Sequence, residues 1–233
     1  TLSAGVDEIT WVLTSFLVAN AISLPVSGWL TNLLGRKRLF IVATVAFTIT
    51  SGVTGAAPSL LVIVLMRFLQ GLAGGPLVPL SQATMMETFP ASQRGMAMAV
   101  WGVGIMFAPI IGPTLGGWIT DSYSWPWIFF VNVPVGLLGI YLTMRNVHEP
   151  ADVLAQNRAR AQATRRNVDY AGIILMAIFI GALQYALEEG SAADWFESTK
   201  IVVATYISAV AFVAFIIREL TAAVPAVDLR MFR

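Results

Sequence analysis

Seven continuous apolar stretches follow one another along the chain, separated by clusters of polar and charged residues. A helix that crosses the hydrocarbon core of a bilayer needs about 20 predominantly apolar residues. Strands of a membrane barrel would alternate in hydrophobicity over about ten residues, and these stretches do not alternate. The pattern predicts an all-α integral membrane bundle with spans at Trp11–Leu34, Leu39–Ala57, Leu60–Ala83, Gly95–Ile119, Trp127–Met144, Tyr170–Leu187 and Ile201–Ile217. Because most connections are short, we expect successive helices to be antiparallel neighbours.

The composition excludes a soluble domain. Hydrophobic residues make up 57% of the 233 residues and charged residues only 12%. A soluble domain carries about 25% charged residues, so this chain has too little charge to cover a surface that faces water. The net charge of +1 gives no overall field for nucleic acid, and the absence of cysteine excludes disulfides and thiolate chemistry.

Basic residues are distributed unevenly between the two sides of the predicted bundle. Lys and Arg are retained on the cytoplasmic side of membrane proteins. Lys200 lies on the other side and Arg67 inside a span, whereas all remaining basic residues fall in alternate connections or the C-terminal tail. We therefore expect an inner (plasma) membrane protein with the N-terminus of this chain outside and its C-terminus in the cytoplasm. The cytoplasmic set is Arg36, Lys37, Arg38, Arg94, Arg145, Arg158, Arg160, Arg165, Arg166, Arg218, Arg230 and Arg233.

One connection is long and polar, and it divides the chain. We expect a helical bundle at 1–144, a cytoplasmic linker at 145–169, two further helices at 170–220 and a lead-in to further sequence at 221–233. The linker arginines allow two interpretations, an amphipathic helix on the anionic inner leaflet or a solvated segment. His148 is expected to be an exposed loop residue, since a metal site needs more ligands than it can find here. The start, Thr1 to Glu8, has no signal-peptide pattern and no methionine, so we expect part of a longer protein.

Two glycines and three cations follow the first span. Gly28 and Gly35 permit a tight turn and close helix approach, and the basic run that follows could serve only as a topology anchor. The arrangement resembles motif A of the major facilitator superfamily, where it lies between the second and third helices. That family usually has an acidic residue at the position of Asn32, which stabilises the outward-open state. Because Asn32 carries no charge, we expect a weaker latch here. The motif A residues are Gly28, Asn32, Gly35, Arg36, Lys37 and Arg38.

The third span contains a cation within the apolar band. Arg67, Gly71, Gly75 and Pro79 recur every four residues and share one helix face. A cation in hydrocarbon costs about 2.5 to 3.5 kcal/mol on insertion scales, so Arg67 should face a cavity or a carboxylate. The alternative is an arginine that extends to water at the outer end of its helix. With Gln70 and Gly71, Arg67 resembles motif B of the same family, whose arginine is linked to proton transfer.

The fourth span has small residues at every fourth position, together with two prolines. Such a ridge lets another helix approach closely, and the prolines remove backbone donors and bend the helix. The run resembles motif C, the antiporter motif of the drug-efflux branches, which lies against the C-terminal half and favours exchange. The motif C residues are Gly104, Ala108, Pro109, Gly112, Pro113, Gly116 and Gly117.

Three further stretches, at 11–21, 127–134 and 225–232, are similar to the EmrB/QacA type of drug:proton antiporter. That type has fourteen helices, with two inserted between its six-helix halves. The resemblance covers essentially the whole chain and implies that the first five spans are helices two to six and the last two are the inserted pair. The first helix of the family, which bears an intramembrane acid, and its second half lie outside this sequence.

The resemblance implies a proton-coupled, EmrB-like multidrug efflux pump that exports lipophilic or cationic drugs and toxic compounds. The proton gradient would drive it, without a cofactor or metal. A periplasmic adaptor and an outer-membrane channel are the implied partners, beside the lipid bilayer. From the residues themselves, polar and apolar side chains at membrane depth are candidates to line a midplane cavity. They are Asn20, Ser23, Gln70, Gln82, Trp101, Met106 and Phe107.

Other functions stay open at this point. A membrane scaffold fragment that does not transport, or a metabolite transporter of the same superfamily, fits the same spans. An intramembrane enzyme would need a nucleophile and base or metal ligands at membrane depth, so we expect a secondary active transporter rather than an enzyme. Every acid lies in a loop or near a helix end; Glu188 and Glu189 either are solvated at the outer face or reach a vestibule.

Overall fold

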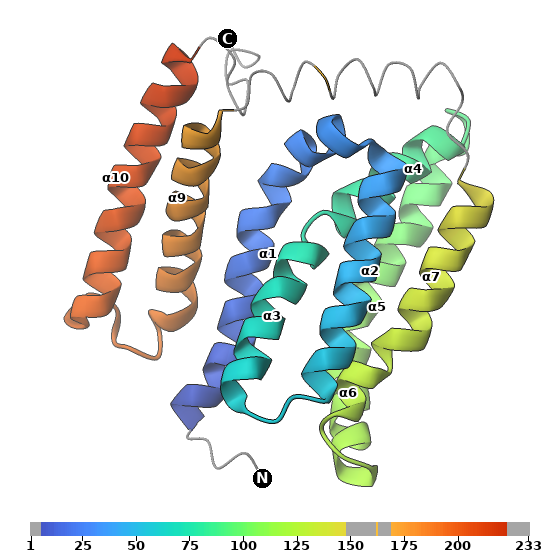
Figure 1. Cartoon of the computed structure of the whole chain (residues 1–233), viewed down its shortest axis with the longest axis horizontal. Helices are drawn as coiled ribbons and strands as arrows, with labels where there is room; N and C mark the ends of the chain where they lie inside the picture. Colours follow the sequence, from blue (N-terminus) through green and yellow to red (C-terminus); the bar gives the residue numbers. More distant parts are fainter. Residues whose placement is uncertain (1–5, 148–161, 163–168, 223–233) are drawn as a thin grey trace.

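The computed structural model describes residues 6–147, 162 and 169–222, and these residues are almost entirely helical (Figure 1). Seven helical stretches are long and apolar enough to cross a membrane, and they coincide with the seven predicted spans. The predicted all-α membrane bundle is therefore confirmed. The elements are α1 Val6–Leu34, α2 Arg36–Gly55, α3 Leu60–Gly74, α4 Leu77–Thr88, α5 Arg94–Ser122, α6 Trp127–Phe130, α7 Asn132–Asn146, α9 Tyr170–Glu189, the 3-10 turn η1 Trp195–Glu197 and α10 Thr199–Thr221.

Two of the crossings consist of two helices each, where we predicted one. The crossing predicted at Leu60–Ala83 is interrupted between α3 and α4, and the one predicted at Trp127–Met144 is interrupted at Val131, between α6 and α7. Proline explains the first interruption, because it has no N–H for the carbonyl four residues earlier. For Pro76 that carbonyl belongs to Leu72, and the Ser23 hydroxyl of α1 donates to it at 2.6 Å.

The order of packing differs from the order along the chain. α3 packs against both α1 and α2 and lies between them in Figure 1. α2 packs in turn against α7, and α9 packs against both α1 and α10. The expectation that successive helices are neighbours holds for α2 with α3 and for α9 with α10. It is wrong for α1 and α2, which make few contacts because α3 separates them.

Two glycines bring the end of α3 against α1, Gly71 within the helix and Gly75 directly after it. A Cβ atom on Gly75 would lie 2.8 Å from the Ser23 Cβ and 2.9 Å from the Asn20 carbonyl oxygen. One on Gly71 would lie 2.9 Å from the Ala19 Cβ and would overlap the Phe16 carbonyl oxygen. Real Cβ atoms do not approach this closely, so only glycine permits this distance between the two helices.

The last two helices form a hairpin that docks on α1. Within the hairpin, the Ser208 hydroxyl of α10 donates to the Phe179 carbonyl of α9 at 3.0 Å. Against α1, the rings of Trp11 and Tyr185 stack with centroids 5.7 Å apart. The linker arginines, His148 and the stretch 225–232 lie outside the described residues, so the division of the chain into four segments stays a prediction.

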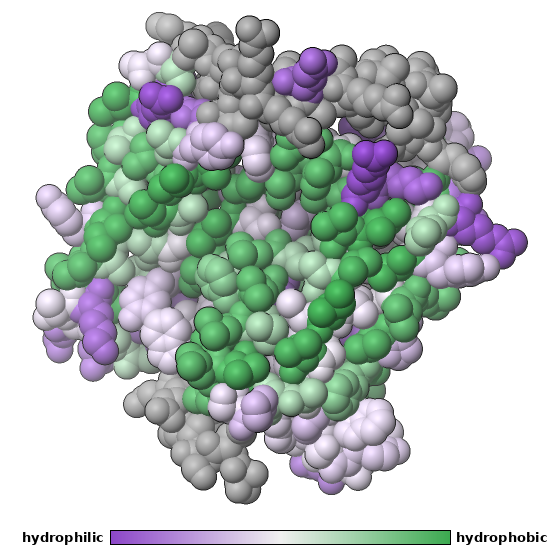
Figure 2. Space-filling model, in the orientation of Figure 1, coloured by the Kyte–Doolittle hydropathy of each residue, from purple (hydrophilic) through white to green (hydrophobic). Residues whose placement is uncertain are grey.

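The outside of the bundle is apolar around its middle. Figure 2 shows hydrophobic side chains over the centre of this face and hydrophilic ones toward its upper and lower edges. Large apolar side chains are widely exposed, such as Met96 at 73% and Tyr206 at 71%. In a soluble protein patches of this size would drive association, whereas in a bilayer they face lipid. The protein is thus a multi-pass membrane protein.

Candidate functional site

Arg67 of α3 is half-buried and turns toward α1. Its Nε donates to the Val12 carbonyl at 3.1 Å, and its Nη1 donates to the Gln70 side-chain oxygen at 2.9 Å. Gln70 itself is only 1% exposed. The guanidinium therefore has one hydrogen-bond acceptor on α1 and one on its own helix, which lowers the cost of placing a charge in the apolar band.

Two aromatic rings flank the same guanidinium. The Arg67 Cζ lies 4.1 Å from the centre of the Phe16 ring and 5.9 Å from that of Phe129. Both distances lie within the range of cation–π attraction, which contributes about 0.5 to 2 kcal/mol. Neither of the ion pairs formed among the described residues involves Arg67. The structure thus surrounds this cation with a carbonyl, an amide and two rings, where we had expected a cavity or a carboxylate.

The other motif B residues lie on the same side of α3. Gly71 and Gly75 form the close contact with α1, and the helix ends next to them. The face that carries Arg67 is therefore also the face that packs closely against α1.

The motif A residues lie where three helices end. Gly35 has a φ of 78°, a conformation that glycine adopts without strain, and it separates α1 from α2. Arg36 forms an ion pair with Glu87 at the end of α4, and Lys37 Nζ donates to the Met144 carbonyl of α7 at 3.4 Å. The cations thus tie α2 to α4 and α7. Gly28, Asn32 and Arg38 are exposed at this end.

The motif C residues face outward from α5. A Cβ atom on Gly104, Gly112, Gly116 or Gly117 would meet no described atom within 4 Å. α5 is a continuous helix despite Pro109 and Pro113. Of the apolar stretch of α5 that could span the membrane, only 6% is buried within the described chain. No helix of the described chain occupies the ridge. We call this ridge, from Gly104 to Gly116, the seam, and its close contact with another helix stays a prediction.

The candidate cavity residues fall into two groups. Asn20, Ser23 and Gln70 lie at the contact between α1 and α3. Trp101 of α5 donates to the Ser81 hydroxyl of α4 at 3.2 Å. Gln82, the residue after Ser81, is half-buried. Met106 and Phe107 are 70% and 54% exposed. The described structure does not bring all of these side chains to one place.

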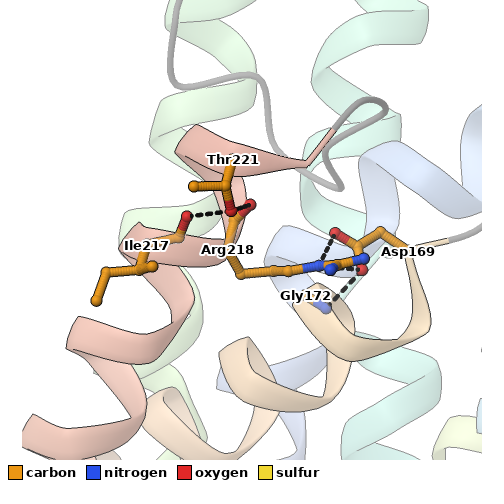
Figure 3. Close-up of polar contacts among 5 residues, drawn as sticks. All are labelled: Asp169, Gly172, Ile217, Arg218 and Thr221. Atoms are coloured by element: carbon orange, nitrogen blue, oxygen red, sulfur yellow. Dashed lines mark hydrogen bonds and ion pairs between the residues drawn. The ribbon is translucent and has the colours of Figure 1, made fainter.

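Sequence reasoning missed an ion pair that joins the last two helices. Asp169 accepts from the Gly172 N–H at 3.0 Å and caps the start of α9, while Arg218 Nε of α10 contacts both Asp169 carboxylate oxygens at 3.1 and 3.2 Å (Figure 3). The Asp169 side chain is 2% exposed and that of Arg218 is 46% exposed. An aspartate three residues before a glycine at the start of an apolar run is a helix-cap signal that could have identified one half of this pair.

Glu189 has a partner that the sequence did not reveal. It accepts a hydrogen bond from the Thr14 hydroxyl of α1 at 2.8 Å, and Thr14 is fully buried. This acid is therefore engaged at the contact between α9 and α1, whereas Glu188 is exposed. Within the described residues, no group of three or more His, Asp and Glu side chains is placed to hold a metal ion.

Known proteins resemble the chain over its whole length. The Major Facilitator Superfamily matches residues 1–229. The multidrug export protein EmrB of Escherichia coli K12 is 41% identical over 233 residues, 100% of this chain and 44% of that protein. The protein of that name in Haemophilus influenzae is 40% identical over 231 residues, 99% of this chain and 44% of that protein. The fatty acid resistance protein FarB of Neisseria gonorrhoeae is 40% identical over 233 residues, with coverage of 100% and 44%. The chain thus spans less than half the length of these relatives.

The first prediction concerns the Asp169–Arg218 pair. Asp169→Asn keeps an acceptor for the Gly172 N–H but removes the charge that pairs with Arg218. Because Arg218 is half-exposed, we expect a loss of stability on the order of 1 kcal/mol or less. The double variant Asp169→Asn, Arg218→Gln should be no less stable than Asp169→Asn alone. Thermal unfolding of the purified full-length protein in detergent measures both.

A matched control is Arg145→Gln, because Arg145 donates to the Tyr141 hydroxyl and pairs with no carboxylate among the described residues. Its effect should add to that of Asp169→Asn. Fully additive effects of the Asp169 and Arg218 substitutions would contradict the pairing.

Proposed function

Because the chain belongs to the major facilitator superfamily, we propose that it forms part of a proton-driven multidrug exporter. The observation that carries this proposal is the identity of 41% over all 233 residues to a protein named as a multidrug exporter. The protein would act as a secondary active transporter, not an enzyme, with the proton gradient as its energy source. The first five crossings would be helices two to six of the family, and the α9–α10 hairpin would be the inserted pair.

The surroundings of Arg67 support proton coupling. A fixed positive charge in a medium of low dielectric constant changes the proton affinity of any carboxylate within about 4 to 6 Å. Two hydrogen bonds and two aromatic rings hold the guanidinium in one place. Such a charge is suited to set the protonation of an acid that approaches it and to release that control when the acid moves away.

For the substrate, lipophilic character has more support than charge. Two of the relatives carry the names of a multidrug exporter and of a fatty acid resistance protein, at nearly equal identity to this chain. Apolar and aromatic walls with few polar groups suit lipophilic compounds of either charge. We propose lipophilic drugs, including cations, as substrates, and a periplasmic adaptor with an outer-membrane channel as partners.

We also propose that the end of the bundle that carries Arg36, Arg94, Arg145 and Arg218 faces the cytoplasm. The bias in basic residues supports this orientation. It places the N-terminus of the chain outside and its C-terminus inside, in the plasma (inner) membrane.

The function is tested by dye-driven proton movement. In proteoliposomes that contain the full-length protein, transport of a lipophilic cationic dye in one direction should drive protons across the membrane in the opposite direction. Arg67→Ala should reduce this flux at least tenfold while membrane insertion stays normal, and Arg67→Lys should retain part of it. Flux without proton exchange would favour a uniporter or a metabolite transporter, and no flux of any lipophilic compound would favour a scaffold.

The seam on α5 has a test of its own. Gly112→Leu should reduce efflux at least tenfold at normal expression, because the leucine would fill a notch where another helix is expected to pack. Ala99→Leu is the matched control, since helix geometry places residue 99 on the other side of α5, where it is also exposed. Equal efflux from the two variants would defeat the proposed seam.

The orientation can be tested by labelling, because these 233 residues contain no cysteine. Ser92, between α4 and α5, and Ser191, between α9 and α10, are exposed at opposite ends of the bundle. In intact cells a membrane-impermeant maleimide should label Ser191→Cys and leave Ser92→Cys unlabelled until the membrane is opened. The reverse pattern would invert the topology.

A further inference from the structure

We propose that Ser51 and Asn132 are positioning residues for Arg67. The hydrogen bonds that they make across the break between α6 and α7 would hold the Phe129 ring beside the Arg67 guanidinium. The proposal deepens the proposed function, on which it rests, because it adds two residues that act on the proton-coupling arginine through a third.

A single hydroxyl group connects α2 to the break. Ser51 Oγ donates to the Phe129 carbonyl at 2.9 Å and accepts from Asn132 Nδ2 at 3.1 Å. Ser51 is fully buried, so no water competes for these bonds. Phe129 belongs to the short helix α6 and Asn132 begins α7, so the hydroxyl bonds to both sides of the interruption at Val131.

The break has a physical cause in the sequence. Pro134 has no N–H for the Phe130 carbonyl four residues earlier, so the helix cannot continue through this turn with its usual bonds. Side chains or neighbouring helices must then satisfy the freed backbone groups, because lipid offers no partner. Ser51 bonds to the Phe129 carbonyl, one residue before the carbonyl that Pro134 leaves without its usual partner, and Asn132 Nδ2 donates to the Ile128 carbonyl at 3.5 Å. These bonds fix the backbone of the turn that carries Phe129.

Small residues of α2 bring this hydroxyl close to the break. A Cβ atom on Gly55 would lie 2.8 Å from the Phe130 ring, and one on Gly52 would lie 3.5 Å from the Val133 side chain. On the opposite helix, a Cβ atom on Gly136 would lie 3.0 Å from the Thr48 Cβ. The contact between α2 and the α6–α7 crossing is therefore a close one, with Ser51 at its centre.

The Phe129 ring connects the break to Arg67. The centre of the Phe129 ring lies 5.9 Å from the Arg67 Cζ. The Phe16 ring of α1 lies nearer to the same atom, at 4.1 Å. The rings of Trp125 and Phe129 meet in an edge-to-face pair with centroids 6.3 Å apart. With its carbonyl held by Ser51 and its ring in contact with Trp125, Phe129 has little freedom to leave the guanidinium.

Displacement of the Phe129 ring should change the pH dependence of dye-driven proton flux more than it changes the affinity for the dye. Coulomb interactions weaken with distance. If the guanidinium occupied several positions, its average effect on the pKa of the carboxylate that exchanges the proton in the proposed exporter would therefore change. A dye that binds elsewhere in the protein does not sense this difference. The readout is therefore the pH of half-maximal dye-driven proton flux, measured beside the KM for the dye.

The test uses Ser51→Ala, Asn132→Ala and Phe129→Leu in the full-length protein in proteoliposomes. Each should shift the pH midpoint by about half a unit or more, all in the direction that Arg67→Lys shifts it, with the KM for the dye changed less than about twofold. Phe129→Tyr keeps the ring and should restore the wild-type midpoint. The double variant Ser51→Ala, Phe129→Leu should shift no further than Phe129→Leu alone.

Two matched controls separate positioning from packing. Ser208→Ala removes the same kind of bond, from a buried serine to the Phe179 carbonyl, within the α9–α10 hairpin. Phe179→Leu removes a ring that pairs with Phe212, with centroids 4.8 Å apart. Neither should move the pH midpoint, whatever its effect on thermal stability.

The outcomes distinguish this proposal from the function that it rests on. Suppose that the wild type moves protons with dye, and that Ser51→Ala, like the control Ser208→Ala, leaves the pH midpoint unchanged. The positioning role is then overturned, and the proposed exporter function stands. Additive shifts in the double variant overturn it as well. If Asn132→Ala fails to insert, Ser51→Ala and Phe129→Leu decide. A wild type without any dye-driven proton flux overturns both proposals.

Discussion

The placement of one guanidinium within the apolar band constrains the rest of the bundle. Arg67 requires acceptors for its N–H groups at a depth where lipid offers none. The Val12 carbonyl is within reach only because α3 lies against α1, and that contact depends on Gly71, where a Cβ atom would overlap the Phe16 carbonyl. Glycine spacing, helix order and the partners of the charge are therefore parts of one solution.

Serine hydroxyls bond to the backbone at both interrupted crossings. At the first, the Ser23 hydroxyl donates to the Leu72 carbonyl. In a regular helix this carbonyl would accept from the N–H of residue 76, which is a proline and has none. At the second, Ser51 donates to Phe129, five residues before Pro134. In each case the hydroxyl comes from a neighbouring helix, so the bond at the interruption also joins the two helices. A proline in a membrane helix thus acts as a specific contact as well as a bend.

The spans and the special position of Arg67 could be predicted from the sequence, because length, hydropathy and the cost of a buried charge are local properties. Apart from Gln70, three residues away, the partners of Arg67 could not, since Val12, Phe16 and Phe129 lie far from it along the chain. The same limit applies to Glu189, whose partner Thr14 is 175 residues away. Helix order also escaped prediction, because an apolar stretch does not specify which of its faces meets which neighbour. Where the proposed seam packs stays a prediction, as the ridge on α5 meets no described neighbour.

The contacts divide the bundle into a stiff part and a loose one. Interhelical contacts through glycine, as between α1 and α3 or between α2 and α7, tolerate little displacement, because packed interiors do not deform continuously. By contrast, the ion pair between Arg36 and Glu87 joins a half-exposed and an exposed side chain, where such pairs contribute little. In the proposed transport cycle, α1, α2, α3 and α7 would therefore move as one body that carries Arg67 with its aromatic neighbours unchanged. Rearrangement would begin at the exposed ion pair between α2 and α4, where breaking contacts costs least.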